Sequence, residues 1–259
     1  MNTMVMDEKA EMEKLLEKTF VSVVCPTADR RKFIPQMLRY FREQDYTGRM
    51  ELVILDSGDD AISDLLADQP ASEFRQIRYE RTEKRPIGSL RNQLNEMAAG
   101  DIIVCFDDDD YYPPERVSHA VAELEAYPDK MIAGVSSQVI YFPDMRCLMQ
   151  TAAKHPYHAT AGTFAYRKEY LKYHRYDELA ARGEEKSFTN GFTVPLIQLD
   201  HRKTILVISH GNNTITKKEL ISYSTPLYFR PIETILDDPQ ACEFYDSLKG
   251  EDNAKRLLI

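Results

Sequence analysis

The first half of the chain contains four short apolar runs that alternate with helical patterns. The runs cover residues 20–25, 51–55, 77–79 and 101–106. Each is short for a helix, and most are rich in β-branched residues, so each is expected to form a buried strand. Strands that alternate with helices at this spacing are typical of an open, mostly parallel sheet with helices on both faces. The sequence therefore predicts an α/β fold.

Helices are expected between these strands. Phe33, Met37, Leu38 and Phe41 share one helical face, and a shorter helix is expected around residues 61–67. Pro86 suits the start of a further helix that would run to about Ala99, before Gly100 closes it.

The second half is less regular. Residues 131–142 are expected to form one long strand, and residues 162–166 and 203–208 two more, so we expect a mixed-sheet extension. No repeat, low-complexity stretch or linker interrupts the chain, which predicts one domain over residues 19–259. Residues 1–18 are expected to form an amphipathic helix or arm, and the segment after Pro231 to pack back on the domain or to serve oligomerisation.

Charge and composition exclude some classes of protein. The chain has 33 basic and 42 acidic residues, a net charge of −9, which argues against a nucleic-acid partner. No stretch approaches the roughly 18 apolar residues of a transmembrane helix. The N-terminus lacks a signal-peptide pattern, and the four cysteines form no close pairing motif. We therefore expect a cytoplasmic protein, at most peripheral to a membrane through partners.

The run Asp107-Asp108-Asp109-Asp110 directly follows the fourth predicted strand. Adjacent carboxylates repel one another unless a cation lies among them, and Mg²⁺ or Mn²⁺ prefers such oxygen ligands. A solvated acidic loop is the simpler alternative. An EF-hand is excluded because Tyr112 stands where its Gly belongs and Ser118 where its Glu belongs. The position after an apolar strand favours a metal site.

Polar turns follow two other predicted strands as well. Pro26 and Thr27 follow the first strand, and Asp56 follows the second. In open α/β sheets, ligands bind at the carboxyl ends of the strands. The turns and the aspartates are thus expected to form one ligand site.

Four segments in this order resemble glycosyltransferase family 2 and its relatives with the GT-A fold. They are residues 21–30 (VSVVCPTADR), 51–58 (ELVILDSG), 87–92 (IGSLRN) and 106–117 (FDDDDYYPPERV). Looser matches follow at residues 162–165, 183–185 and 209–210. The resemblance implies a nucleotide-binding half, residues 19–117, and an acceptor-binding half, residues 118–259. It also implies a sugar-nucleotide donor, UDP-linked in the uridine-binding members, and an acceptor hydroxyl on a glycan or other molecule.

The resemblance further implies roles for single residues. Pro26 and Thr27 would line the base and ribose through their backbone, and Asp56 would bond the base. Arg91 would face the phosphates or base, and Asp108 the ribose or donor sugar. The principal metal ligand would be Asp109, with Asp107 or Asp110 adding a contact. Asp29, with Arg30 and Arg31, is either a helix cap that contacts phosphate or, as the simpler interpretation, part of a solvated charge cluster.

Two later positions complete the expected site. Transfer with inversion needs a base near the acceptor hydroxyl, and the family places an acidic pair at this point. Glu185 is the expected base and Glu184 the second choice, although Glu pairs are also common at helix starts. His210 follows an apolar run and is the expected histidine ligand of the metal.

Two other functions compete with this interpretation. A sugar-nucleotide nucleotidyltransferase would need a Gly-rich phosphate loop after the first strand, where this chain has Pro26 to Asp29. A non-catalytic carbohydrate-binding relative would keep the fold but not need its carboxylates. The two acidic motifs favour the enzyme, an inverting, metal-dependent glycosyltransferase.

Overall fold

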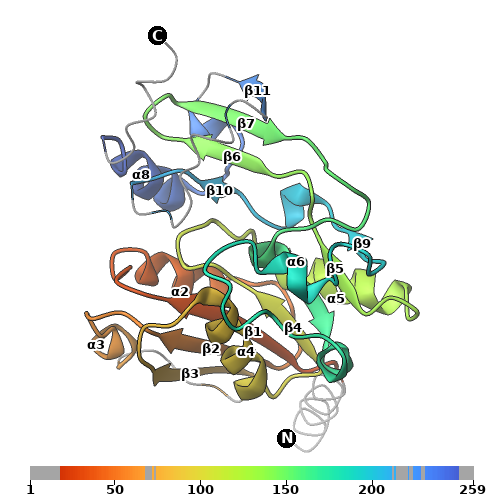
Figure 1. Ribbon diagram of the computed structural model, residues 1–259. Coiled ribbons are helices and arrows are strands. Elements are labelled where there is room, and N and C mark those ends of the chain that lie inside the picture. Colours follow the sequence, from red (N-terminus) through yellow and green to blue (C-terminus); the bar gives the residue numbers. More distant parts are fainter. Residues whose placement is uncertain are drawn as a thin grey trace, which may run out of the picture.

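A mixed sheet of seven strands forms the centre of the computed structural model (Figure 1), which describes residues 18–67, 72, 74–211, 213, 221, 224–228 and 231–250. The arm expected over residues 1–18 lies outside this part, apart from Lys18. In sheet order the strands are β3 (Arg75–Arg81), β2 (Met50–Asp56), β1 (Val21–Thr27), β4 (Ile102–Cys105), β8 (Ala165–Arg167), β5 (Ile132–Gly134) and β9 (Ile197–Gln198). β1 to β4 are parallel, and β8 is antiparallel to both of its neighbours. The α/β prediction is confirmed.

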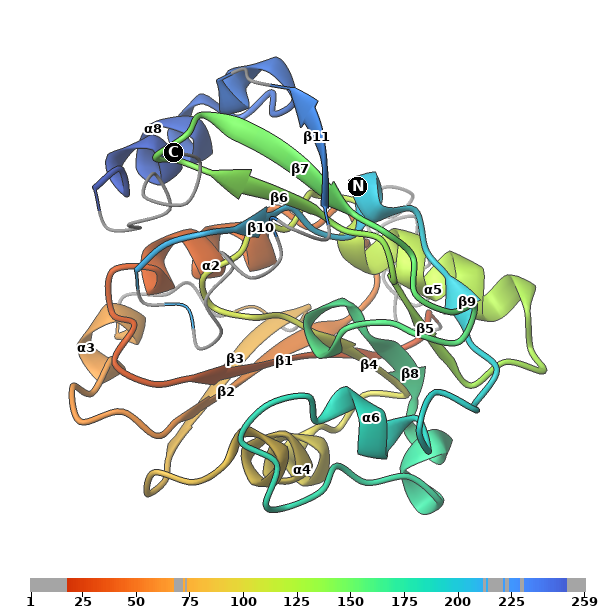
Figure 2. The ribbon, with the colours of Figure 1, turned by 45° about the horizontal axis from the view of Figure 1, so that its top comes forward.

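Helices cover both faces of this sheet (Figure 2). α2 (Ile34–Arg42) and α5 (Arg116–Ala126) pack on one face, and α4 (Ile87–Met97) with the short α6 (Glu185–Phe188) packs on the other. α3 (Ser63–Leu66) follows β2. The described residues also form the helical segments Ala161–Thr163 (η1), Lys168–Lys172 (η2), His201–Lys203 (η3), Ile232–Thr234 (η4) and Pro239–Ser247 (α8).

The central strands are buried on both faces, which explains their continuous apolar sequence. Val23 and Leu52 belong to the core beneath α2, whereas their neighbours Val24 and Val53 belong to the core beneath α4. Successive side chains of a strand point to opposite faces, so an uninterrupted apolar run can fill both cores.

The strand order reverses at β1. The chain passes from β1 to β2 and β3 on one side, then returns to place β4 on the other side of β1. A crevice opens at the carboxyl ends of two strands where the order reverses in this way. The acidic run follows β4 at this position, beside Thr27 at the end of β1.

A second sheet lies beyond α2 (Figures 1 and 2). Its order is β10 (Val207–Ile208), β6 (Val139–Phe142), β7 (Cys147–Thr151) and β11 (Ser224–Tyr228). α8 packs back on α2, where the hydroxyls of Tyr40 and Tyr245 lie 3.1 Å apart. Of the two expectations for the segment after Pro231, packing on the domain is the one observed.

The prediction of one long strand over residues 131–142 is wrong. The segment forms β5 in the first sheet and β6 in the second. Between β5 and β6, side-chain oxygens accept the backbone hydrogen bonds that a neighbouring strand would otherwise accept. Val135 N donates to Thr163 Oγ1, and Ser136 N donates to Gln198 Oε1. The other two expected strands are shorter than predicted, because η1 occupies the start of residues 162–166 and η3 the start of residues 203–208.

Within the described residues, no helix is long and apolar enough to cross a membrane.

Leu52→Ala is expected to destabilise the protein by about 2–5 kcal/mol, because the fully buried Leu52 fills the core beneath α2 and its truncation leaves a cavity. Leu179→Ala is the matched control, since Leu179 is 83% exposed and its loss should change stability by less than about 0.5 kcal/mol. Urea unfolding followed by circular dichroism measures both. Equal midpoints for the two variants would contradict the assignment of Leu52 to the core.

Candidate active site

A hollow of about 250 Å³ opens at the carboxyl ends of β1 and β4. Segments from both halves of the chain line it: Pro26, Thr27, Ala28 and Arg30 after β1; Ile87, Leu90 and Arg91 of α4; Asp107 to Asp110; Ala181, Arg182 and Glu184 before α6; and Asn213 after β10. The structure thus brings most of the residues predicted from sequence into one hollow.

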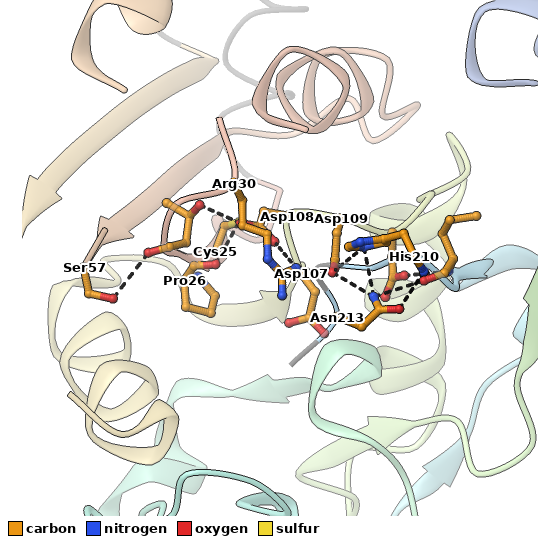
Figure 3. Close-up of polar contacts among 12 residues, drawn as sticks. Cys25, Pro26, Arg30, Ser57, Asp107, Asp108, Asp109, His210 and Asn213 are labelled. Carbon is orange, nitrogen blue, oxygen red and sulfur yellow. Dashed lines mark hydrogen bonds and ion pairs between the residues drawn. The ribbon is translucent and has the colours of Figure 1, made fainter. Parts of the chain in front are cut away.

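Asp108 is tied to the end of β1. Thr27 Oγ1 donates to its Oδ2 at 2.6 Å, and Arg30 Nη1 donates to its Oδ1 at 3.2 Å (Figure 3). Burial, followed by the charge of Asp109, raises the pKa of Asp108 despite the opposing effect of Arg30. Burial thus makes the charged form of this carboxylate costly, and a cation beside it would lower that cost.

Asp109 faces the second sheet. His210 Nε2 lies 3.0 Å from its Oδ2, Asn213 Nδ2 donates to the same oxygen at 3.2 Å, and Arg30 Nη1 also contacts it (Figure 3). The His210 side chain is fully buried, and its ring packs on Phe33 with 4.6 Å between centroids. An imidazole nitrogen and a carboxylate oxygen are thereby held side by side at the edge of the hollow.

Arg91 joins Asp107 to Glu184. Its Nη2 donates to Asp107 Oδ1 and its Nε donates to Glu184 Oε1, both at 2.9 Å. Within the described part of the chain, its third nitrogen, Nη1, is buried without a hydrogen-bond partner. A buried guanidinium N–H without an acceptor costs free energy. A ligand atom that accepts a hydrogen bond from it would remove this cost.

Asp110 anchors the acidic run to the second sheet. Its Oδ1 accepts a hydrogen bond from the backbone N–H of Ile208 in β10 at 2.8 Å. The next residue, Tyr111, exchanges two backbone hydrogen bonds of 3.0 Å with Leu206. Asp110 lines the hollow, but this oxygen is engaged by the backbone.

Gly162 in η1 packs directly against Asp107. A Cβ atom at position 162 would lie 2.3 Å from Asp107 Oδ2, so a larger residue would force the carboxylate to move. The Tyr112 hydroxyl links the same two residues, because it accepts a hydrogen bond from Asp107 N at 2.6 Å and donates one to Gly162 O at 3.2 Å.

Asp29 and Asp56 are not among the described residues that line the hollow. Asp56 is buried, and its carboxylate accepts hydrogen bonds from Gly58 N at 2.9 Å and the Tyr79 hydroxyl at 2.8 Å. Asp29 adopts a φ of 55° and accepts from Asp59 N at 2.6 Å. Both carboxylates shape the turn after β2, beside the hollow.

The two glutamates differ in their surroundings. Glu184 lines the hollow and is ion-paired with Arg91, whereas Glu185 begins α6. Burial, and to a smaller extent the charge of Glu184, raises the pKa of Glu185.

Three polar residues that line the hollow were not predicted as site residues. Arg30 was interpreted more simply as part of a solvated cluster, yet its side chain is only 13% exposed and bridges Asp108 and Asp109. Arg182 and Asn213 had no role in the prediction. The signals available were position alone: Arg30 follows Thr27 by three residues, and Asn213 follows His210 by three.

A hollow at the switch point of an α/β sheet, lined by carboxylates and arginines, is typical of nucleotide-binding enzymes. The model of glycosyl transferase family 2 matches residues 22–192. The chain belongs to this family.

Solved structures show the same fold. A mannosyltransferase from Pyrobaculum calidifontis, PcManGT, in complex with GDP-Man and Mn²⁺, superposes with a TM-score of 0.60 at 18% identity, over 88% of this chain and 73% of that one. A fragment of S. aureus TarS, residues 1–349, superposes with a TM-score of 0.55 at 19% identity, over 74% of this chain and 60% of the fragment. The same fragment in complex with UDP-GlcNAc gives a TM-score of 0.52 at 16% identity, over 80% and 64%. The fold is therefore GT-A, and the chain matches only part of the length of the TarS fragment.

Gly162→Ala is expected to destabilise the wild-type protein because the added methyl group collides with the Asp107 carboxylate. In an Asp107→Ala background the collision is absent, so the same substitution should cost less. A double-mutant cycle from urea unfolding measures the coupling, which should be about 0.5–3 kcal/mol. Additive effects of the two substitutions would show that Gly162 does not act through Asp107.

Proposed function

We propose that this chain is a metal-dependent, inverting glycosyltransferase that moves a sugar from a nucleotide-diphosphate donor, a UDP-sugar in the first instance, to an acceptor hydroxyl. One observation carries the proposal. The hollow brings Asp107 to Asp110 together with the Arg30 and Arg91 side chains, at the sheet edge where such folds bind nucleotides, and His210 lies against Asp109. The carboxylates suit a cation, and the arginines suit a phosphate oxygen.

The residues present fit a divalent ion. Asp109 Oδ2 and His210 Nε2 would hold it, since a carboxylate and a neutral imidazole together suit Mn²⁺, and Mg²⁺ accepts the carboxylate. Among the described residues, no group of three or more His, Cys, Asp or Glu side chains forms a ready-made metal cage. This supports an ion whose remaining coordination positions would be filled by diphosphate oxygens and water. When bound, the ion would neutralise negative charge on the departing nucleoside diphosphate.

Donor binding would draw on three parts of the hollow. Pro26 and Thr27 would contact the nucleoside through their backbone, and Arg91 would face the phosphates or base. Arg182, on the exposed loop before α6, would add a further cation beside the phosphates. Asp108, hydrogen-bonded by Thr27, would face a ribose or sugar hydroxyl.

The Glu184 carboxylate lines the hollow but is already engaged by Arg91. We therefore assign the base to Glu185, the residue that the family resemblance implies. Burial raises the pKa of Glu185, which makes its carboxylate a better proton acceptor than that of an ordinary glutamate. In the reaction, the acceptor oxygen bonds to the anomeric carbon as the bond to the diphosphate oxygen breaks. The hydroxyl proton passes to the Glu185 carboxylate, and the anomeric configuration inverts.

Asp109→Ala is expected to abolish Mn²⁺-dependent turnover of the donor, and Glu185→Gln to lower kcat by about 10²- to 10⁴-fold while nucleotide binding persists. Release of UDP measures turnover, and thermal shift with UDP and Mn²⁺ measures binding. Metal-dependent turnover that survives in Asp109→Ala would overturn the assignment. A wild-type protein that binds UDP-sugars without turnover would instead indicate a non-catalytic relative.

The raised pKa of Glu185 predicts the acid limb of the pH profile. A protonated carboxyl cannot accept the acceptor's proton, so kcat/KM should fall as pH decreases through this pKa, at a higher pH than for an ordinary glutamate. Steady-state kinetics across the pH range measures the limb. A profile that remains flat down to the usual pKa of glutamate would exclude Glu185 as the base.

A further inference from the structure

A second hollow, of about 420 Å³, lies at the end of β5. The residues that line it come from three segments: the link after β5, the loop between β7 and η1, and the region of β9 and η3. Its volume lies within the range of small-molecule sites, about 300–1,000 Å³.

The polar groups of this hollow carry positive or neutral charge. Lys154, His155 and His201 line it together with Ser136, Ser137 and Gln198, and no acidic side chain is among its described lining residues. Lys154 is exposed and forms no ion pair within the described part of the chain. This contrasts with the net negative charge of the protein, and it makes the hollow a local site for anions.

A hydrogen-bonded frame holds Lys154 in place over the hollow. Ser136 Oγ accepts from the backbone N–H of Lys154 at 3.1 Å and lies 2.9 Å from His158 Nδ1. Gln198 Nε2 donates to the carbonyls of Pro156 at 2.8 Å and His158 at 2.9 Å. The loop that carries Lys154 is thus tied to β5 and β9, as a binding site requires.

The same loop connects the hollow to the candidate active site. It runs from the second sheet back toward the first (Figure 1) and ends in η1, where Gly162 contacts Asp107. Lys154 is also near enough to Glu185 for its charge to lower the pKa of that carboxylate. The hollow therefore lies on the side of the site where the proposed base acts.

We propose that this hollow binds an anionic group of the acceptor, a phosphate or a carboxylate, and that Lys154 is its main cationic contact. The inference rests on the proposed transferase function, since it assigns the acceptor class for that site. An acidic glycan would place its charge on the Lys154 ammonium group and would present a neighbouring hydroxyl to Glu185.

Three small probes test the proposal: glucose 6-phosphate, glucuronate and glucose, each titrated into the full chain by ligand-observed NMR at low ionic strength. The wild type should bind both anionic probes more tightly than glucose. Lys154→Ala should weaken the anionic probes by about 10-fold or more, the effect expected for losing one charge-assisted hydrogen bond. Lys154→Arg should retain most of the affinity. Lys172→Ala, an exposed lysine in η2, is the control for the same loss of charge elsewhere.

Equal affinity for glucose and the anionic probes, or equal effects of Lys154→Ala and Lys172→Ala, would overturn the proposal. The tighter of the two anionic probes identifies phosphate or carboxylate as the recognised group. Thermal shift of the wild type with UDP and Mn²⁺ separates this test from that of the proposed function. Binding of UDP without preference for anions defeats the acceptor assignment alone, whereas binding of anions without UDP defeats the transferase proposal.

Discussion

Carboxylates placed side by side in a buried setting require compensating cations, and this requirement organises the centre of the molecule. Arg91 reaches from α4 to Asp107 and Glu184, and Arg30 reaches from the turn after β1 to Asp108 and Asp109. Breaking one such buried pair leaves an uncompensated charge, which is strongly destabilising. The turn after β1, α4, the acidic run and the segment before α6 are therefore fixed relative to one another by charge as well as by packing.

Consecutive residues of the acidic run serve different parts of the structure. Asp107 contacts α4, Asp108 the end of β1, Asp109 the residues after β10, and Asp110 the backbone of β10 itself. A tight turn after a strand directs successive side chains in different directions, which lets four adjacent carboxylates meet four different partners. Asp109 is the proposed metal ligand among the four because its carboxylate lies beside the His210 imidazole.

The first half of the fold could be predicted because its strands are buried on both faces and appear as continuous apolar runs. The same property misled the prediction for residues 131–142, where an apolar run crosses from one sheet to another. The break at Val135 and Ser136 depends on hydrogen bonds from Thr163 and Gln198, which are distant in sequence. The acidic run and His210 could be selected as candidates from their motif and their position after apolar runs. Arg30 could not, because only the tertiary structure shows which carboxylates its guanidinium contacts.

Asp109 and His210 are 101 positions apart in the sequence. Asp109 follows a strand of the first sheet, and His210 follows a strand of the second. An ion held between them would act as a reversible cross-link that closes a long loop of the chain. Because the ion would meet both ligands only in the folded chain, its binding would stabilise the fold by mass action. Occupancy of the site would then add one more tie between the two sheets, beside the hydrogen bonds that join Asp110 to Ile208 and Tyr111 to Leu206.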